Sequence, residues 1–307
     1  MWTVTAKRST VSCNIPLNVS RSYLQSDANV RKISGYITKK VADRLEEIFK
    51  EERSTFEEKW DNIKLFIEYG MLSDEKFCDR AMKFALVKNT DGKYFSLDDY
   101  KKAVEGEQTD KDKHVICLYA TNADEQYAFI EAAKNKGYDV LLLDCELDSH
   151  LVNLLETKME NVRFARVDSD NVENLIVKEE KKKPELSEDE KKALDDLFKP
   201  ALPAEFDWNV EAENLGETGE PVLITQNEFM RRYREMSALG GGMNYFGNMP
   251  KNYTLKVNLE HPLVQKLRSG EPNEDLLHQL TDLALLANGM LKGKPLADFI
   301  ARSQKLL

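Results

Sequence analysis

The sequence has few cysteines, no long apolar run and no excess of positive charge. No apolar stretch approaches the roughly 18 residues that a membrane-spanning helix needs, and the first residues lack the apolar core of a signal peptide. The formal net charge of −10 argues against nonspecific binding to nucleic acid. The four scattered cysteines form no CxxC pair, which indicates reduced thiols and no zinc site: Cys13, Cys78, Cys117 and Cys145. We therefore expect a cytoplasmic protein with no metal site, no membrane contact and no nucleic-acid partner.

The first part of the chain shows helical periodicity. A length of 307 residues, with 41% hydrophobic residues, suits about two domains with real cores. Apolar residues recur every three or four positions over residues 30–48, which predicts a long amphipathic helix. The pattern Ser54-x-x-Glu57 predicts a capping box at the start of a second helix. We expect Gly70 to end that helix and Ser73 to begin a third.

The periodicity changes after about residue 107. Short apolar runs rich in β-branched residues alternate with two helical segments, and these runs cover residues 114–120, 138–143 and 162–167. The order β-α-β-α-β predicts a small parallel sheet with helical crossovers.

Three acidic residues follow the second predicted strand, at a position where open α/β sheets often bind ligands: Asp144, Glu146 and Asp148. A small-molecule enzyme with a metal or acid–base cluster there is one interpretation. An ordinary acidic loop is the interpretation we favour, because no glycine-rich phosphate loop follows the first strand and no His or Lys is spaced as a partner.

A charged segment separates this unit from the rest of the chain. Residues 178–192, KEEKKKPELSEDEKK, are nearly all charged, which predicts a solvated linker. Within it, Ser187-x-x-Glu190 predicts a capping box that begins the next helix. Beyond it, three strand-like segments predict an antiparallel sheet, at residues 206–210, 222–225 and 253–259.

A methionine-rich segment lies between the last two of these strands. Thr225-x-x-Glu228 is expected to begin its helix, and three glycines at 240–242 indicate a mobile, poorly buried segment. Four of the nine methionines fall within about twenty residues, and methionine-rich surfaces are typical of proteins that bind varied partners. Binding and ordinary core packing both remain open on the residues alone. The candidate binding residues are Phe229, Met230, Tyr233, Met236, Met243 and Phe246.

The last segment, residues 274–307, predicts a pair of helices with more apolar side chains than one buried face needs. Such a helical hairpin at a chain terminus is best satisfied by a second copy of itself in a four-helix bundle. We therefore expect a homodimer through this segment. The expected interface residues are Leu276, Leu277, Leu280, Leu283, Leu286, Leu296, Phe299 and Ile300.

The stretch IPLNVSRSYLQ, residues 15–25, is the most informative motif. Asn18 to Ser20 can cap a helix, which places Arg21 in its first turn with Gln25 one turn later on the same face. Helix N-termini disfavour cations, so Arg21 suits that position only if an anion such as a phosphate comes to meet it. An ordinary exposed arginine is the alternative.

The pattern PLNVSR-x-x-LQ resembles the conserved loop of the heat-shock protein 90 chaperones, the bacterial HtpG type in particular. The resemblance continues to the last residue and fails before about Asn14, so residues 1–14 are an unmatched leader. It implies that Arg21 contacts the γ-phosphate of ATP held in a separate N-terminal domain, with Gln25 in support, as the catalytic residues. ATP and Mg would belong to the full-length ATPase, and this chain would hold no cofactor and be inactive alone. His150 stands where relatives usually carry Trp or Tyr.

The resemblance implies a mixed α/β and α+β fold in four parts after the leader. These are a three-helix connector (15–106), a small α/β subdomain with a parallel sheet (107–178), a charged linker (179–190) and an α+β dimerisation domain (191–307). It also implies a stress-response chaperone that binds unfolded clients in an ATP-dependent cycle, and it favours client binding for the methionine-rich helix. A passive dimeric peptide-binding scaffold without nucleotide chemistry is the alternative, and the role of Arg21 separates the two.

Overall fold

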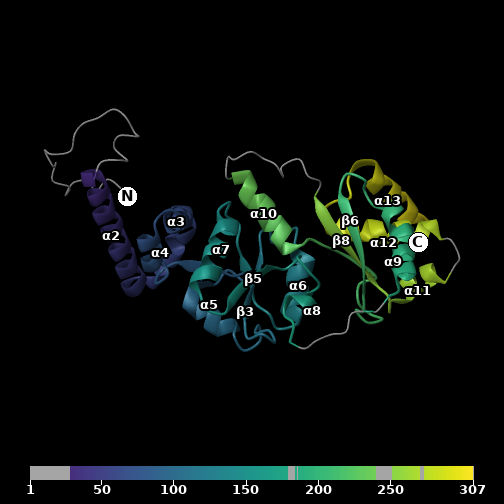
Figure 1. The fold of residues 1–307 in the computed structure, drawn as a ribbon, viewed down its shortest axis with the longest axis horizontal. Coiled ribbons are helices and arrows are strands. Elements are labelled where there is room, and N and C mark those ends of the chain that lie inside the picture. Colours follow the sequence, from purple (N-terminus) through teal and green to yellow (C-terminus); the bar gives the residue numbers. More distant parts are fainter. Residues whose placement is uncertain (1–27, 179–183, 185, 240–250, 270–272, 307) are drawn as a thin grey trace. The chain divides into compact units, whose positions relative to one another are not determined.

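The computed structural model describes residues 28–178, 184, 186–239, 251–269 and 273–306 (Figure 1). The chain divides into two compact units, Met1–Ala85 and Leu86–Leu307. The mixed α/β architecture predicted from the sequence is confirmed. No helix within the described ranges is long and apolar enough to cross a membrane.

Three helices make up the described part of the first unit: α2 (Ala28–Glu51), α3 (Arg53–Ser73) and α4 (Glu75–Ala81). Their core is aromatic. Phe56 lies 5.7 Å from Trp60 and 6.3 Å from Phe84, measured between ring centroids, and all three side chains are buried. The Phe56–Phe84 pair meets edge to face, and contacts of this kind add to the free energy that burial alone contributes.

Three local predictions for these helices are wrong. The helix α3 begins at Arg53 and its N-cap residue makes no side-chain cap bond, so the Ser54 capping box does not form. Gly70 lies inside α3, where a Cβ atom would stand 2.6 Å from the Phe77 ring. The glycine therefore allows close packing of α4 rather than ending the helix. Asp74, not Ser73, caps α4, because its Oδ1 accepts a hydrogen bond from the Phe77 amide at 3.1 Å.

The second unit opens with the antiparallel pair β1 (Leu86–Lys88) and β2 (Tyr94–Ser96), followed by α5 (Leu97–Val104). Ser96 caps α5, because its side-chain oxygen accepts a hydrogen bond from the Asp99 amide at 3.2 Å. Residues 86–104, which the sequence assigned to the connector, belong to this unit by their contacts. Asn89, for example, donates a hydrogen bond to Asp139, 50 residues further along the chain, at 2.9 Å.

The predicted parallel sheet is confirmed, with strand order β4-β3-β5. Its elements are β3 (Val115–Ala120), α6 (Tyr127–Asn135), β4 (Val140–Leu142), α7 (Asp148–Lys158), β5 (Val162–Arg166) and α8 (Val172–Leu175). Figure 1 shows α5 and α7 on one side of the strands and α6 with α8 on the other. Because both faces are covered, every residue of the central strand β3 is buried. The strand β5 lies at an edge of this sheet.

The last part of the chain surrounds a second three-stranded sheet, with order β6-β8-β7. Its strands are β6 (Asp207–Glu213), β7 (Val222–Thr225) and β8 (Asn252–Asn258). The prediction of an antiparallel sheet holds for β7 with β8 but is wrong for β6 with β8, which are parallel. Since β7 and α10 (Glu228–Leu239) lie between β6 and β8 in the chain, the connection is a crossover rather than a hairpin.

Helices cover this sheet and complete its core. They are α9 (Glu188–Phe198), a short 3₁₀ turn (Lys199–Ala201), α11 (Pro262–Arg268), α12 (Glu274–Ala287) and α13 (Gly293–Leu306). The Ser187–Glu190 capping box at the start of α9 is confirmed, with both reciprocal hydrogen bonds present. Phe198, Leu255 and Val264 are fully buried in one cluster that joins α9, β8 and α11.

Candidate functional site

The helix α10 has two chemically different faces. Its outward face carries Phe229, Met230 and Tyr233, and Phe229 is the most exposed of the three at 73%. Its inward face carries Arg231 and Arg232, of which Arg231 is 3% exposed. The predicted cap at Thr225 is replaced by Asn227, whose side-chain oxygen accepts from the Met230 amide at 3.1 Å. The methionine-rich helix is therefore exposed on one side, as expected, and docked by charged residues on the other.

Glu228 is the centre of the docked face. Its Oε1 accepts hydrogen bonds from Tyr119 Oη at 2.8 Å, from Arg231 Nη2 at 2.7 Å and from Arg232 Nε at 2.6 Å. Burial alone would raise the pKa of the Glu228 carboxyl, but the two guanidinium groups hold this pKa below its usual value. Burial, with the carboxylate of Glu228, raises the pKa of the Tyr119 hydroxyl, which therefore remains a protonated donor.

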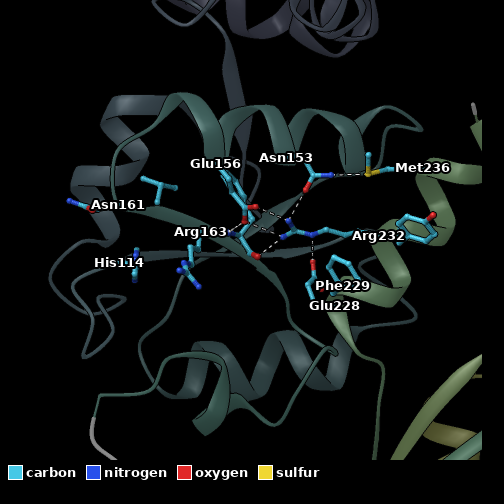
Figure 2. A pocket seen from close by; sticks show the side chains of 12 residues that line it. His114, Asn153, Glu156, Asn161, Arg163, Glu228, Phe229, Arg232 and Met236 are labelled. Atoms are coloured by element: carbon cyan, nitrogen blue, oxygen red, sulfur yellow. Dashed lines mark hydrogen bonds and ion pairs between the residues drawn. The ribbon is translucent and has the colours of Figure 1, made fainter.

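Arg232 connects α10 to the outer edge of β5 (Figure 2). Its guanidinium donates to the Phe164 carbonyl and forms an ion pair with Glu156 of α7, with Nη1 2.9 Å from Oε2. The other carboxylate oxygen of Glu156 accepts from the Phe164 amide at 2.7 Å. Two residues further along β5, the main-chain amide of Arg166 donates a hydrogen bond to Glu228 Oε2 at 3.3 Å. Side chains of α7 and α10 thus satisfy main-chain groups of an edge strand.

The second turn of α10 adds further polar contacts. Both oxygens of Glu235 accept from Arg231 Nη1, at 2.7 and 2.8 Å, and Oε2 also accepts from the Ser149 hydroxyl of α7. The side-chain amide nitrogen of Asn153, Nδ2, donates a hydrogen bond to the sulfur of Met236 at 2.8 Å. Among residues 228–236, whose side chains the structure describes, only the two arginines are buried. Charged and polar contacts, rather than apolar packing, therefore hold this part of the helix.

A groove of about 710 Å³ lies between β5, α7 and α10. Figure 2 shows His114, Asn161 and Arg163 toward one end and Phe229 with Met236 toward the other. The ion pairs of Arg232 lie between these ends. The groove thus combines an aromatic and thioether wall with a polar end beside an edge strand.

The helices α12 and α13 pack one face against the core of their own chain. Leu280 and Phe299, which the sequence assigned to a dimer interface, are buried in that core. Three others pack partly against it: Leu276, Leu277 and Leu296. The remaining three are between 41% and 48% exposed: Leu283, Leu286 and Ile300.

Other predicted positions fall elsewhere. Arg21, Gln25, Met243 and Phe246 lie outside the described residues. Within the acidic cluster after the second strand, Asp148 is buried, and its Oδ2 accepts from the Cys145 amide at 2.6 Å at the start of α7. This contact gives Asp148 a structural role in beginning the helix.

The docked face of α10 was not predicted from the sequence. Its signal is the spacing of Glu228, Arg231, Arg232 and Glu235, which places four charges on one helix face. Such spacing ordinarily indicates a solvated face with local ion pairs. Only the partners Tyr119 and Glu156, which lie 76 to 112 residues away in the chain, make it a buried one.

Comparison of this sequence with known proteins identifies the family of the chain. Residues 10–296 match the family described as Hsp90 protein. The chain is 47% identical to the chaperone protein HtpG of Porphyromonas gingivalis, over 96% of this chain and 53% of that protein. It is 45% identical to the chaperone protein HtpG of Bacteroides fragilis, over 96% and 54%, and 28% identical to that of Ruthia magnifica, over 96% and 47%. The chain thus spans about half the length of the curated relatives it matches, and over this span it belongs to the Hsp90 family.

Proposed function

We propose that this chain is part of a molecular chaperone and binds nonnative segments of client proteins on the outward face of α10. The observation that carries the proposal is an exposed apolar helix face whose opposite face is fixed by buried arginines. The rings of Phe229 and Tyr233 stack with centroids 6.3 Å apart and an interplanar angle of 20°, so they form one contact surface. Unfolded chains expose apolar side chains that such a surface can cover.

The test is suppression of aggregation of a model client by the double variant Phe229→Ser with Tyr233→Ser. We expect the variant to lose most of this activity while its melting temperature stays within a few degrees, because both side chains are exposed. Tyr127→Ser is the matched control, since Tyr127 is 63% exposed on α6, outside the groove. Equal loss in both variants, or no loss in either, would contradict the proposal.

We also propose that the chain forms a homodimer through residues 274–307. Only Leu283, Leu286 and Ile300, among the interface residues expected from the sequence, keep more than two-fifths of their surface exposed. Burying a side chain of this size fully contributes about 1.5–3 kcal/mol. Six half-buried side chains across two chains therefore contribute roughly 4–8 kcal/mol, against an association cost of about 4–15 kcal/mol. These residues alone support a weak dimer, so a tight one needs further contacts.

We further propose that Arg21, supported by Gln25, contacts the γ-phosphate of ATP held by another domain of the whole protein. Membership in the Hsp90 family and the match of PLNVSR-x-x-LQ to the loop of that family support this role. The planar guanidinium would span two phosphate oxygens, which an ammonium group cannot do. ATP and Mg would be ligands of the whole protein, and clients its substrates.

A further inference from the structure

The Glu156–Arg232 ion pair occupies the place of a residue from a neighbouring strand. The amide of Phe164 donates to Glu156 and the carbonyl of the same residue accepts from Arg232. A paired strand would offer β5 one carbonyl and one amide in these positions. Within the described ranges, no strand pairs with the outer side of β5. Two side chains, joined by an ion pair 2.9 Å long, therefore close an otherwise open sheet edge.

The contacts that hold α10 against this edge are of a kind that water and salt can replace. Its buried side chains in residues 228–236 are two arginines, and their partners are carboxylates, a hydroxyl and a carbonyl. The desolvation of such charges offsets much of their mutual attraction, so the net free energy of docking is small compared with an apolar interface. Since α10 belongs to the connection between β7 and β8, its release breaks no strand pairing.

We propose that the outer edge of β5 is a docking site for an extended segment of a nonnative protein chain, and that Arg232 of α10, together with Glu156 of α7, occupies this site when no client is bound. The segment would add to the sheet as a fourth strand, through main-chain hydrogen bonds to Phe164 and Arg166. The proposal rests on the proposed chaperone function and specifies how the client is held. Main-chain bonding tolerates many sequences, which suits a protein that receives varied clients.

The groove fits such a ligand. It runs beside Val162, Arg163 and Phe164 of β5, so side chains of an added strand would enter it at alternate positions. Phe229 and Tyr233 of α10 line the other side of this groove in the unbound chain, and once the polar contacts of α10 with β5 are released they can cover apolar side chains of the added strand. The occupant is thus an extended peptide with apolar residues at every second position.

The experiment uses the full chain and a labelled nine-residue peptide of alternating valine and threonine. Two further peptides carry N-methyl groups on alternate residues, one on the odd positions and one on the even positions. N-methylation removes main-chain donors from one edge of the peptide while its side chains remain. We expect fluorescence anisotropy to show at least a tenfold loss of affinity for one methylated peptide and less than a threefold change for the other.

Equal affinity of the two methylated peptides would overturn strand addition and leave client binding by α10 in place. If the unmodified peptide also fails to bind, strand addition falls, and the aggregation assay with Phe229→Ser and Tyr233→Ser decides separately on the proposed function.

A variant tests the role of α10 as the occupant. Arg232→Met frees the Phe164 carbonyl, so we expect the affinity for the unmodified peptide to rise several-fold. Arg302→Met is the matched control, because Arg302 forms a similarly buried ion pair with Asp282 that joins α12 and α13 away from β5. If Arg232→Met does not fold, raising the salt concentration on the unchanged chain weakens the same ion pairs and should raise affinity likewise. If the affinity for the unmodified peptide stays unchanged in Arg232→Met, or at raised salt where that variant does not fold, the role of α10 as the occupant is overturned.

Discussion

Replacing Glu228 by Gln should release the start of α10 from the α/β subdomain. The substitution preserves the size of the side chain but removes the charge that both guanidinium groups share. Arg231 keeps Glu235 as a partner and Arg232 keeps Glu156. The Tyr119 hydroxyl, which donates to Glu228, would face a neutral amide instead.

The magnitude follows from these contacts. A hydrogen bond to a charged group contributes about 1.5–3 kcal/mol, and Glu228 makes two to guanidinium groups through Oε1 alone. The carbonyl oxygen of Gln retains part of each bond, and the desolvation that the carboxylate suffers is relieved. We therefore expect a net loss of about 2–3 kcal/mol in the docking free energy of α10, which corresponds to roughly 30- to 150-fold in the opening equilibrium.

Hydrogen exchange of the α10 amides measures this opening directly. The amides of β3, which is buried on both faces, serve as an internal reference and should change little. Glu217→Gln is the control, because Glu217 is an exposed residue of the β6–β7 connection, and we expect it to change exchange by less than about 0.5 kcal/mol. Exchange of α10 within that limit for Glu228→Gln as well would refute the assignment of Glu228 as the centre of docking.

The same carboxyl predicts a pH dependence of docking. The pKa of Glu228 in the folded chain lies below its ordinary value of 4.5. A depressed folded pKa means that the contribution is fully present above the ordinary value and is lost as the pH falls through the folded one. Protection of α10 should therefore be constant near neutral pH and decline below about pH 4.5, and Glu228→Gln should make this decline smaller, because the ion pairs of Glu156 and Glu235 remain.

Two further predictions concern the dimer and the nucleotide. At a protein concentration at which the parent chain sediments as a dimer, Leu283→Ser with Ile300→Ser should shift sedimentation to the monomer, and a persistent dimer would place the interface elsewhere. In a protein that joins this chain to the nucleotide-binding domain of the family, Arg21→Ala should lower steady-state ATP turnover by about 10- to 1,000-fold without a matching loss of nucleotide affinity. Arg21→Lys should not restore turnover, whereas Gln25→Ala should cost less; turnover within about threefold of the parent would leave Arg21 without a role in the chemistry.

Sequence patterns predicted the elements that depend on neighbouring residues. The capping bonds at Ser187 form because the donor and acceptor lie three residues apart, and the parallel sheet follows from apolar runs separated by helices. Gly70 was interpreted as the end of a helix, but its role depends on the Phe77 ring, which packs against it from the next helix. The parallel pairing of β6 with β8 was missed for a related reason, since a strand order is a property of the chain path and not of either strand.

The candidate site likewise has one part that sequence reasoning reached and one part that depends on distant residues. The exposure of the apolar residues of α10 was favoured by the resemblance to the family, whereas their spacing and methionine content alone left surface binding and core packing both open. The docked face does not follow from the sequence, because Arg231 is buried only by virtue of Tyr119 and Arg232 only by virtue of Glu156 and Phe164. A charge at helical spacing carries no information about such distant partners.

The orientation of α10 itself supports a binding role. A helix that packs on a protein ordinarily turns its apolar side chains inward and its charges toward water. Here Phe229 and Tyr233 face outward while two arginines face inward, although burying the Phe229 ring would contribute about 1.5–3 kcal/mol. The reversed arrangement keeps the apolar face available and fixes the helix through contacts that depend on charge. A client that covers Phe229 and Tyr233 and supplies main-chain groups to β5 would therefore compete with α10 only for polar contacts, and these have close equivalents in a strand.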